Sequence, residues 1–209
     1  MMMFVSLLLI AAAAQMLGGI LSWFLIERFY RSIRTAIFAE IAIMLIIVAM
    51  LIEEGLRISS ISITGLLIGI IAVDFLNRVV PHKHQTKAEK IGFLAFIAMC
   101  FHEFPEGVAF GAAYLIDPGF GLLTAFMMAL HHVPEGSIVS VPYFIKKRFA
   151  RGFGALAVTA SLYTAGGLVA YSLIMSIPLE LRALSMTFAA GAMLYIVAEE
   201  FLWSKCVKG

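Results

Sequence analysis

Two copies of one six-residue pattern lie near the middle of the sequence, and both combine residue types that bind metal ions. Residues 102–107 read His-Glu-Phe-Pro-Glu-Gly, and residues 131–136 read His-His-Val-Pro-Glu-Gly. Each copy lies inside a long apolar run, where ionisable side chains are costly to bury and are usually functional. The pattern His-x-x-Pro-Glu-Gly therefore indicates a working site.

The spacing within each copy predicts a shared four-residue metal site. His102 and Glu106 are one helical turn apart and point the same way, as are His131 and Glu135. A short turn at 116–119 makes the two runs antiparallel neighbours, which places His102 level with Glu135 and His131 level with Glu106. Two imidazoles and two carboxylates suit a divalent ion such as zinc or ferrous iron. Because such ligands bind metal in their deprotonated forms, we expect binding to weaken as the pH falls.

Two further candidates directly follow the histidines, at Glu103 and His132. They lie about 100° around the helix from the first ligands. They form a second site, a relay between neighbouring sites, or a group that orients the first ligands. Pro105 and Pro134 each remove a backbone donor, so we expect both helices to be kinked beside the histidine.

Composition predicts the elements that position this site. The 209 residues are 62% hydrophobic and 13% charged, whereas a soluble domain is about half apolar and a quarter charged. Runs of roughly 20 apolar residues span a bilayer. We therefore expect an all-α polytopic membrane bundle that forms one domain over 1–209. Its seven helices are expected at about 4–26, 35–52, 60–80, 91–115, 119–145, 152–176 and 180–203.

Basic residues predict the orientation of these helices. If the connections alternate between the two sides, one side and the C-terminal tail hold every Lys and Arg except Arg57 and Arg182. The positive-inside rule then places the N-terminus outside and the C-terminus inside. No basic residue precedes the first run, so we expect it to be a retained spanning helix. The net charge of +2 gives no indication of a nucleic-acid partner.

With these features, the sequence resembles the ZIP family of divalent-metal transporters, in particular its short prokaryotic members. The family carries His-Asn-x-Pro-Glu-Gly on its fourth helix and a similar copy on its fifth. Further stretches also resemble the family, at 75–84, 107–111, 140–142, 188–195 and 199–200.

The resemblance implies eight helices in a three-two-three arrangement, in which the outer triplets are inverted repeats. It implies a multi-pass protein of the inner or plasma membrane that is not an enzyme and is often a homodimer. It also implies uptake of zinc, iron or manganese into the cytosol without ATP, by an elevator-like or rocking movement. The metal is then the cargo and no resident cofactor is expected; cadmium also suits such a site.

Three departures from the family pattern stand out. Glu103 and His132 replace the usual Asn or Asp. The run 152–176 has no carboxylate where the sixth helix of the family often supplies a glutamate, which leaves Ser161 and Thr164 as the nearby polar residues. We also expect no counterpart of the eighth helix, because the seventh run is followed only by a short tail to Gly209.

The remaining polar residues have weaker signals. Met50 and Glu54 share a helix face at an outer end and are either a metal entrance or ordinary interfacial residues. Asp74 precedes Arg78 by one turn, which predicts a helix ion pair. The positions without a firm role are His82 and His84 in a basic loop, Glu199 and Glu200 near an inner end, and Glu40.

Two other functions remain open from the sequence. His102-Glu103 begins like the zinc-protease motif His-Glu-x-x-His, which would make the chain an intramembrane zinc metalloenzyme, but Glu106 stands near the place of the second histidine. The chain is alternatively a truncated metal-binding fragment without transport. The two cysteines, Cys100 and Cys206, form no disulfide or metal motif.

Overall fold

The computed structural model describes the backbone of residues 1–79 and 87–206. Within these ranges, the side chains are described except at 26–34, 36, 37, 76, 77, 79, 87–95, 97, 98, 101, 102, 199, 200 and 202–206. His82 and His84 lie outside the described residues, and so do the side chains of His102, Glu199 and Glu200.

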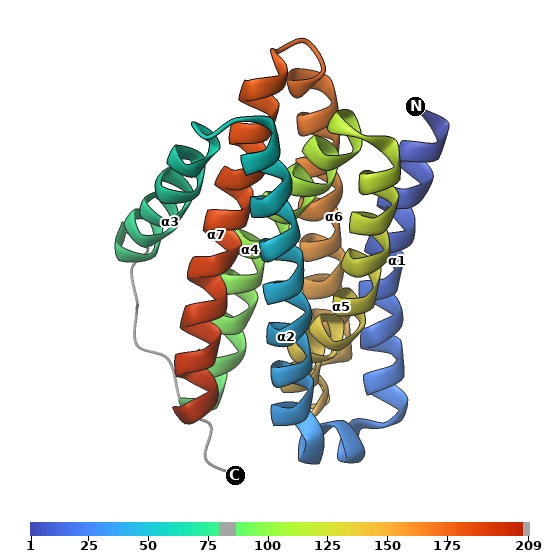
Figure 1. Cartoon of the computed structure of the whole chain (residues 1–209). Helices are drawn as coiled ribbons and strands as arrows, with labels where there is room; N and C mark the ends of the chain where they lie inside the picture. The colour runs from blue at the N-terminus through green and yellow to red at the C-terminus, as the bar shows by residue number, and fades with distance from the viewer. Residues whose placement is uncertain (80–86, 207–209) are drawn as a thin grey trace.

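The described residues form seven α-helices and no strand, so the predicted all-α class is confirmed (Figure 1). Successive helices run in opposite directions along one bundle. Their bounds are α1 Met2–Phe24, α2 Ile26–Ile58, α3 Ser62–Val79, α4 Lys87–Ile116, α5 Pro118–Phe144, α6 Phe149–Ile174 and α7 Leu179–Cys206.

One helix differs clearly from its predicted span. The apolar run predicts a helix from about 35, whereas α2 begins at Ile26 and extends over 33 residues. No glycine or proline interrupts residues 26–54, so the helix continues through the basic segment that precedes the apolar run. Hydropathy thus locates the apolar part of α2 but not the residue at which the helix begins.

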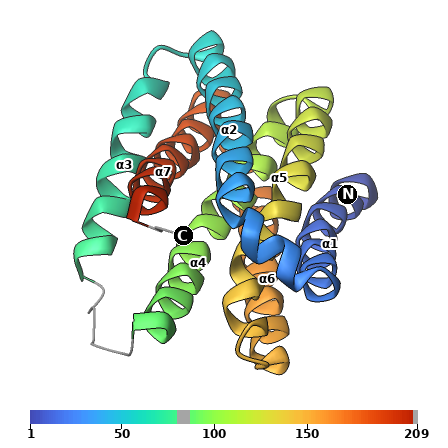
Figure 2. The ribbon, with the colours of Figure 1, turned by 90° about the horizontal axis from the view of Figure 1, so that it is seen from below.

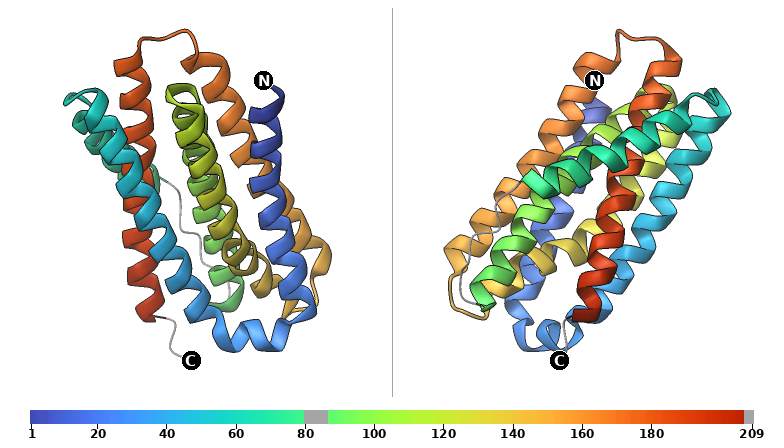
Figure 3. Two further views of the ribbon diagram at one scale, coloured as in Figure 1. Left: turned by 45° about the vertical axis from the view of Figure 1, so that its right-hand side comes forward. Right: turned by 90° about the vertical axis from the view of Figure 1, so that its left-hand side faces the viewer.

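The seven helices divide into two groups when viewed along the bundle (Figure 2). The first group contains α1, α4, α5 and α6, in which α4 packs closely on α6 and α1 on α5. The second group contains α2, α3 and α7. The groups meet where α7 lies against α4 and α2 lies against α5 (Figure 3). The two motif-bearing helices therefore lie between the other elements.

Glycines spaced four residues apart allow some of these close helix contacts. Gly65 and Gly69 of α3 lie directly on backbone carbonyls of Leu184 and Phe188 in α7, where a Cβ atom would collide. Gly111 of α4 packs against the Cβ atom of Ala170 in α6, where a Cβ atom would also collide.

Three helical segments are long and apolar enough to cross a membrane: Met2–Phe24, Phe149–Ile174 and Leu179–Ala198. The outward surface is rich in large apolar side chains, including Ile71 and Phe75 of α3, whereas several charged side chains are fully buried. A buried polar interior with an apolar exterior is the arrangement that a bilayer favours. These features support the predicted membrane location.

Candidate metal centre

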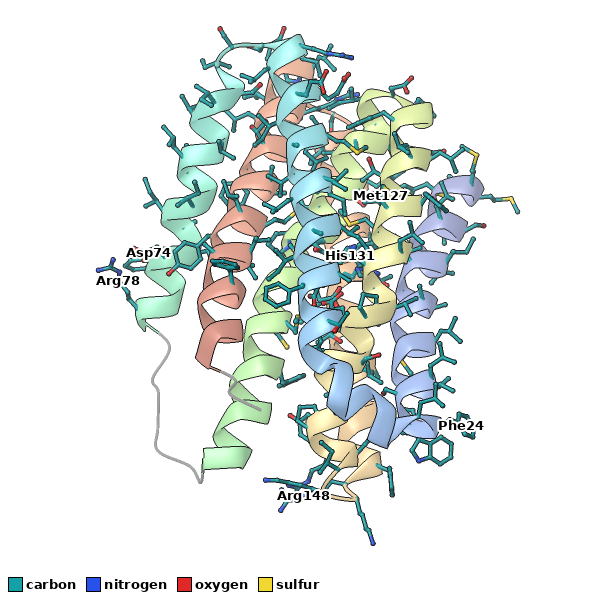
Figure 4. The ribbon with its side chains drawn as sticks, turned by 60° about the horizontal axis from the view of Figure 1, so that its bottom comes forward. Phe24, Asp74, Arg78, Met127, His131 and Arg148 are labelled. Carbon is teal, nitrogen blue, oxygen red and sulfur yellow. The ribbon has the colours of Figure 1, made fainter. Side chains whose placement is uncertain are left out.

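Five ionisable residues of the two motif copies meet in the middle of the bundle. Glu103 and Glu106 come from α4, and His131, His132 and Glu135 come from α5; all five are fully buried. Figure 4 shows His131 among the central helices, with Met127 one turn away on α5. The site is therefore closed to the surroundings on every side.

The turn before α5 fixes where this helix starts. Asp117 caps the helix by accepting a hydrogen bond from the backbone N–H of Phe120 at 2.7 Å. Pro118 occupies the first helical position, where its missing N–H is not needed. The start of α5 thereby fixes the height at which its histidines face α4.

Glu106 is the centre of the cluster. Both of its carboxylate oxygens lie 3.0 Å from Nε2 of His131, and Oε2 lies 3.1 Å from Nε2 of His132. Oε2 of Glu135 is 3.9 Å and 3.8 Å from the same two nitrogens. One potential ligand atom from each of these four residues lies within 4.8 Å of the others. The group has the size and composition of a four-ligand metal site.

The other nitrogen of each imidazole faces a backbone carbonyl. Nδ1 of His132 donates to the carbonyl of Ala11 in α1 at 2.8 Å, and Nδ1 of His131 faces the carbonyl of Met127 at 3.4 Å. A proton on Nδ1 leaves the lone pair of Nε2 for an ion. Carbonyl partners of this kind orient histidine ligands in metal sites. Both rings are thus presented through Nε2 toward Glu106.

The cluster carries a strong excess of acidic groups. The Glu135 carboxyl lies in the field of the Glu103, Glu106 and Glu40 carboxyls. No lysine or arginine of the described chain forms an ion pair with Glu103 or Glu135. Uncompensated charge in a dry interior costs several kcal/mol per ion. A divalent cation would offset two carboxylates, so the donor set fits such an ion.

The predicted ligands meet partly as the antiparallel register implies. His131 lies against Glu106, the level predicted for it. The side chain of His102 is outside the described residues, so its pairing with Glu135 remains a prediction. His132, assigned from sequence to a second site, a relay or an orienting group, shares Glu106 with His131; which of these functions it has remains a prediction.

Glu103 stands slightly apart from this group. Its Oε2 lies 3.7 Å from Nε2 of His132, while its Oε1 accepts a hydrogen bond from the side-chain amide of Gln15 in α1. Glu103 is not among the four residues whose ligand atoms converge. The structure thus brings Glu103 and His132 side by side, and only His132 is among the four converging residues.

The candidate entrance residues do not join the cluster. Glu54 lies at the far end of α2, 3.7 Å from Arg57, and Met50 is half-buried one turn before it. Arg57 makes a shorter pair with the exposed Glu53 at 2.6 Å. A metal-entrance function for Met50 and Glu54 therefore remains a prediction.

The predicted helix pair in α3 is confirmed. Asp74 accepts from Arg78 at 2.9 Å and from the hydroxyl of Tyr195 in α7 at 3.2 Å. Figure 4 shows Asp74 and Arg78 at the edge of the bundle, away from His131. Asp74 therefore links α3 to α7 and has no part in the central cluster.

Sequence reasoning missed two buried polar residues beside the cluster, Gln15 and Tyr163. The Tyr163 ring of α6 lies 4.7 Å from the His132 ring, edge to face. In the described part of the chain, the hydroxyls of Ser161 and Thr164, the polar residues considered in α6, donate to backbone carbonyls of their own helix. The signal available for Gln15 was an amide side chain in the middle of an apolar run.

Both motif glycines pack in an equivalent way. Gly107 of α4 lies on the backbone carbonyl of Tyr163 in α6, and Gly136 of α5 lies on that of Gln15 in α1. These contacts bring each polar residue to the height of the motif. The packing is reciprocal, since Gly166 lies on the carbonyl of Phe104 and Gly18 on that of Val133.

No protein-family model matches the chain, and no curated protein is significantly similar to it in sequence. The functional argument therefore depends on the doubled motif and on the geometry of the residues it brings together.

Proposed function

We propose that this chain is a secondary transporter that moves a divalent transition-metal ion, zinc or else iron or manganese, across a membrane into the cytosol. The observation that carries the proposal is the convergence of Glu106, His131, His132 and Glu135 at a fully buried point. Mixed nitrogen and oxygen ligands suit these ions. Ligands from two adjacent antiparallel helices also suit an ion that must be released again.

The proposed topology has seven spans, with the N-terminus outside and the C-terminus inside. The basic residues that follow α5, including Arg148, lie at one end of the bundle (Figure 4). Arg57, in the last turn of α2, and Arg182, near the start of α7, lie at the other end. The positive-inside rule makes the Arg148 end cytosolic. The cluster would then lie about midway along the path of the ion.

Ion binding would exchange hydration water for protein ligands. Two carboxylates offset the charge of the ion, and two imidazoles complete a tetrahedral set. Release requires that the ligands on α4 and α5 be exposed alternately to each side of the membrane. In the two-group arrangement, the group of α1, α4, α5 and α6 would shift against the group of α2, α3 and α7. The resemblance to the ZIP family supports this direction of transport and a homodimeric assembly.

Zinc uptake into proteoliposomes tests the proposal. Purified protein is reconstituted, external zinc is added, and a zinc-sensitive dye inside the vesicles reports entry. We expect uptake by the wild type and loss of at least about 90% of the rate in Glu135→Gln, because a ligand charge is removed. Glu53→Gln, at an exposed glutamate of α2, is the matched control and should keep the wild-type rate.

The outcomes separate the possible functions. Zinc binding by the wild type without any uptake would reduce the chain to a metal-binding protein. Hydrolysis of a peptide or lipid that requires Glu135, again without uptake, would instead favour the metalloenzyme. Equal uptake by Glu135→Gln and the wild type would remove the central cluster from the transport path.

A further inference from the structure

Helix α1 holds both residues that directly follow the motif histidines. The carbonyl of Ala11 accepts from Nδ1 of His132 at 2.8 Å, and one turn later the side-chain amide of Gln15 donates to Oε1 of Glu103. One helix therefore determines how the second position of each motif copy is oriented. Neither contact is implied by the motif itself.

The two contacts have opposite effects on the metal cluster. The bond to Ala11 orients the His132 ring so that its Nε2 faces Glu106, and His132 is thereby available as a ligand. The bond to Gln15 occupies one oxygen of Glu103, and the other oxygen remains 3.7 Å from Nε2 of His132. Glu106 approaches the same nitrogen to 3.1 Å. Oε2 of Glu103 is about as near to this nitrogen as Oε2 of Glu135 is, at 3.8 Å, but Glu103 is not among the four residues whose ligand atoms all converge.

The position of Gln15 is fixed by its backbone. A Cβ atom at Gly136 would collide with the carbonyl of Gln15, so α1 lies directly on α5 at this height. Gln15 is fully buried, and its Oε1 has no hydrogen-bond partner within the described part of the chain. A buried amide with an unpaired oxygen is unfavourable on its own, so the hydrogen bond that its nitrogen donates to Glu103 is the contact that favours this placement.

An amide at this position satisfies Glu103 without adding charge. Glutamine donates a hydrogen bond and remains neutral, whereas a lysine or arginine would compete with a cation for the carboxylates. A third carboxylate at the ion would leave a negative charge that a single divalent cation does not offset. More oxygen ligands would also favour ions that prefer oxygen, such as manganese, over zinc.

We propose that Gln15 is a specificity-determining positioning residue that holds Glu103 out of the coordination shell, so that the cluster binds one divalent ion through Glu106, His131, His132 and Glu135. This inference rests on the proposed function, because it presupposes that the cluster binds metal. The inference goes beyond that function, because it states that one ion binds per chain, that zinc is preferred to manganese, and that Gln15 sets both properties.

Equilibrium dialysis of the purified protein against zinc, with and without competing manganese, tests the inference. The wild type and Glu103→Gln should each bind one zinc ion per chain with affinities within about threefold. Gln15→Leu should also bind one ion but shift the preference toward manganese by about tenfold or more, because the freed carboxylate of Glu103 joins the ligands. The double variant Gln15→Leu/Glu103→Gln should return to the wild-type preference.

A matched control distinguishes positioning from general packing of α1. Ser22→Ala removes a buried hydrogen bond of 2.9 Å between α1 and Ser140 of α5 without touching the cluster. It should leave both the number of ions and the preference unchanged. A shift in preference equal to that of Gln15→Leu would show that α1 packing, and not the amide, is responsible.

Other results would overturn the inference in distinct ways. Two zinc ions bound by the wild type and one by Gln15→Leu would make Gln15 part of a second ion site. A loss of zinc affinity in Glu103→Gln as large as in Glu135→Gln would make Glu103 a ligand. The absence of zinc binding by the wild type would instead refute the proposed function.

Discussion

Replacement of Glu106 by glutamine is the most direct test of the central cluster. Glu106 contacts both described imidazoles, at 3.0 Å and 3.1 Å, and is fully buried. Glu106→Gln preserves the shape of the side chain but removes its charge. The new amide group can also donate to an Nε2 lone pair, which would occupy a metal ligand. We therefore expect metal binding to be lost while the fold is retained.

The burial of the site sets how much zinc affinity Glu106→Gln should lose. Removal of one partner from a buried charge pair costs about 3–5 kcal/mol. Each step of about 1.4 kcal/mol is a factor of ten in Kd. The zinc Kd of Glu106→Gln should therefore rise by about a hundredfold to a few thousandfold. Solvent screening does not reduce this value, because no part of the side chain is exposed.

Competition with a chromophoric zinc chelator measures the change in the purified protein. Glu106→Asp is a useful second variant, because it keeps the charge and shortens the side chain by one methylene; it should retain part of the affinity. Glu180→Gln, at an exposed residue of α7, is the control and should bind like the wild type. A Kd for Glu106→Gln within threefold of the wild type would refute the assignment of Glu106 as a ligand.

Three further changes test the packing around the site. Gly136→Ala should lower the free energy of unfolding by about 1–3 kcal/mol, because the new methyl group meets a backbone carbonyl of α1. The control Gly154→Ala should be tolerated, because a Cβ atom there meets nothing within 4 Å. Arg182→Ala removes three hydrogen bonds to backbone carbonyls, so it should destabilise the protein by about 1.5–3 kcal/mol in a thermal unfolding assay. The control Arg57→Ala removes an exposed ion pair and should have little effect. Asp74→Asn should leave zinc binding unchanged in the dialysis assay; a loss of binding would contradict its assignment as a link between α3 and α7.

The helical part of the fold follows directly from the sequence. The apolar runs predict seven helices, and the described residues form seven. Local signals are sufficient because a helix satisfies its backbone within one segment, as an apolar surrounding requires. The start of α2 was misplaced because hydropathy reports the apolar length, whereas the helix ends only where the backbone is interrupted.

The sequence also predicted part of the central site. Residues one turn apart on a helix share a face whatever surrounds them. The short turn at Asp117 forces α4 and α5 to be antiparallel neighbours, so the contact of His131 with Glu106 follows from spacing alone. The donor groups of the proposed metal site are therefore encoded locally, in two short stretches of the chain.

Only the tertiary structure decided how the second motif positions are used. Glu103 and His132 are equivalent in the motif, yet Glu103 is hydrogen-bonded by the side chain of Gln15, whereas His132 donates to the backbone carbonyl of Ala11. Both partners lie on α1, about 90 to 120 residues away along the chain. Their height and rotation depend on where α1 packs against Gly136, a contact between distant segments that no local spacing specifies. The sequence by itself determined which residues can bind an ion, and the packing of α1 decided which of them face it.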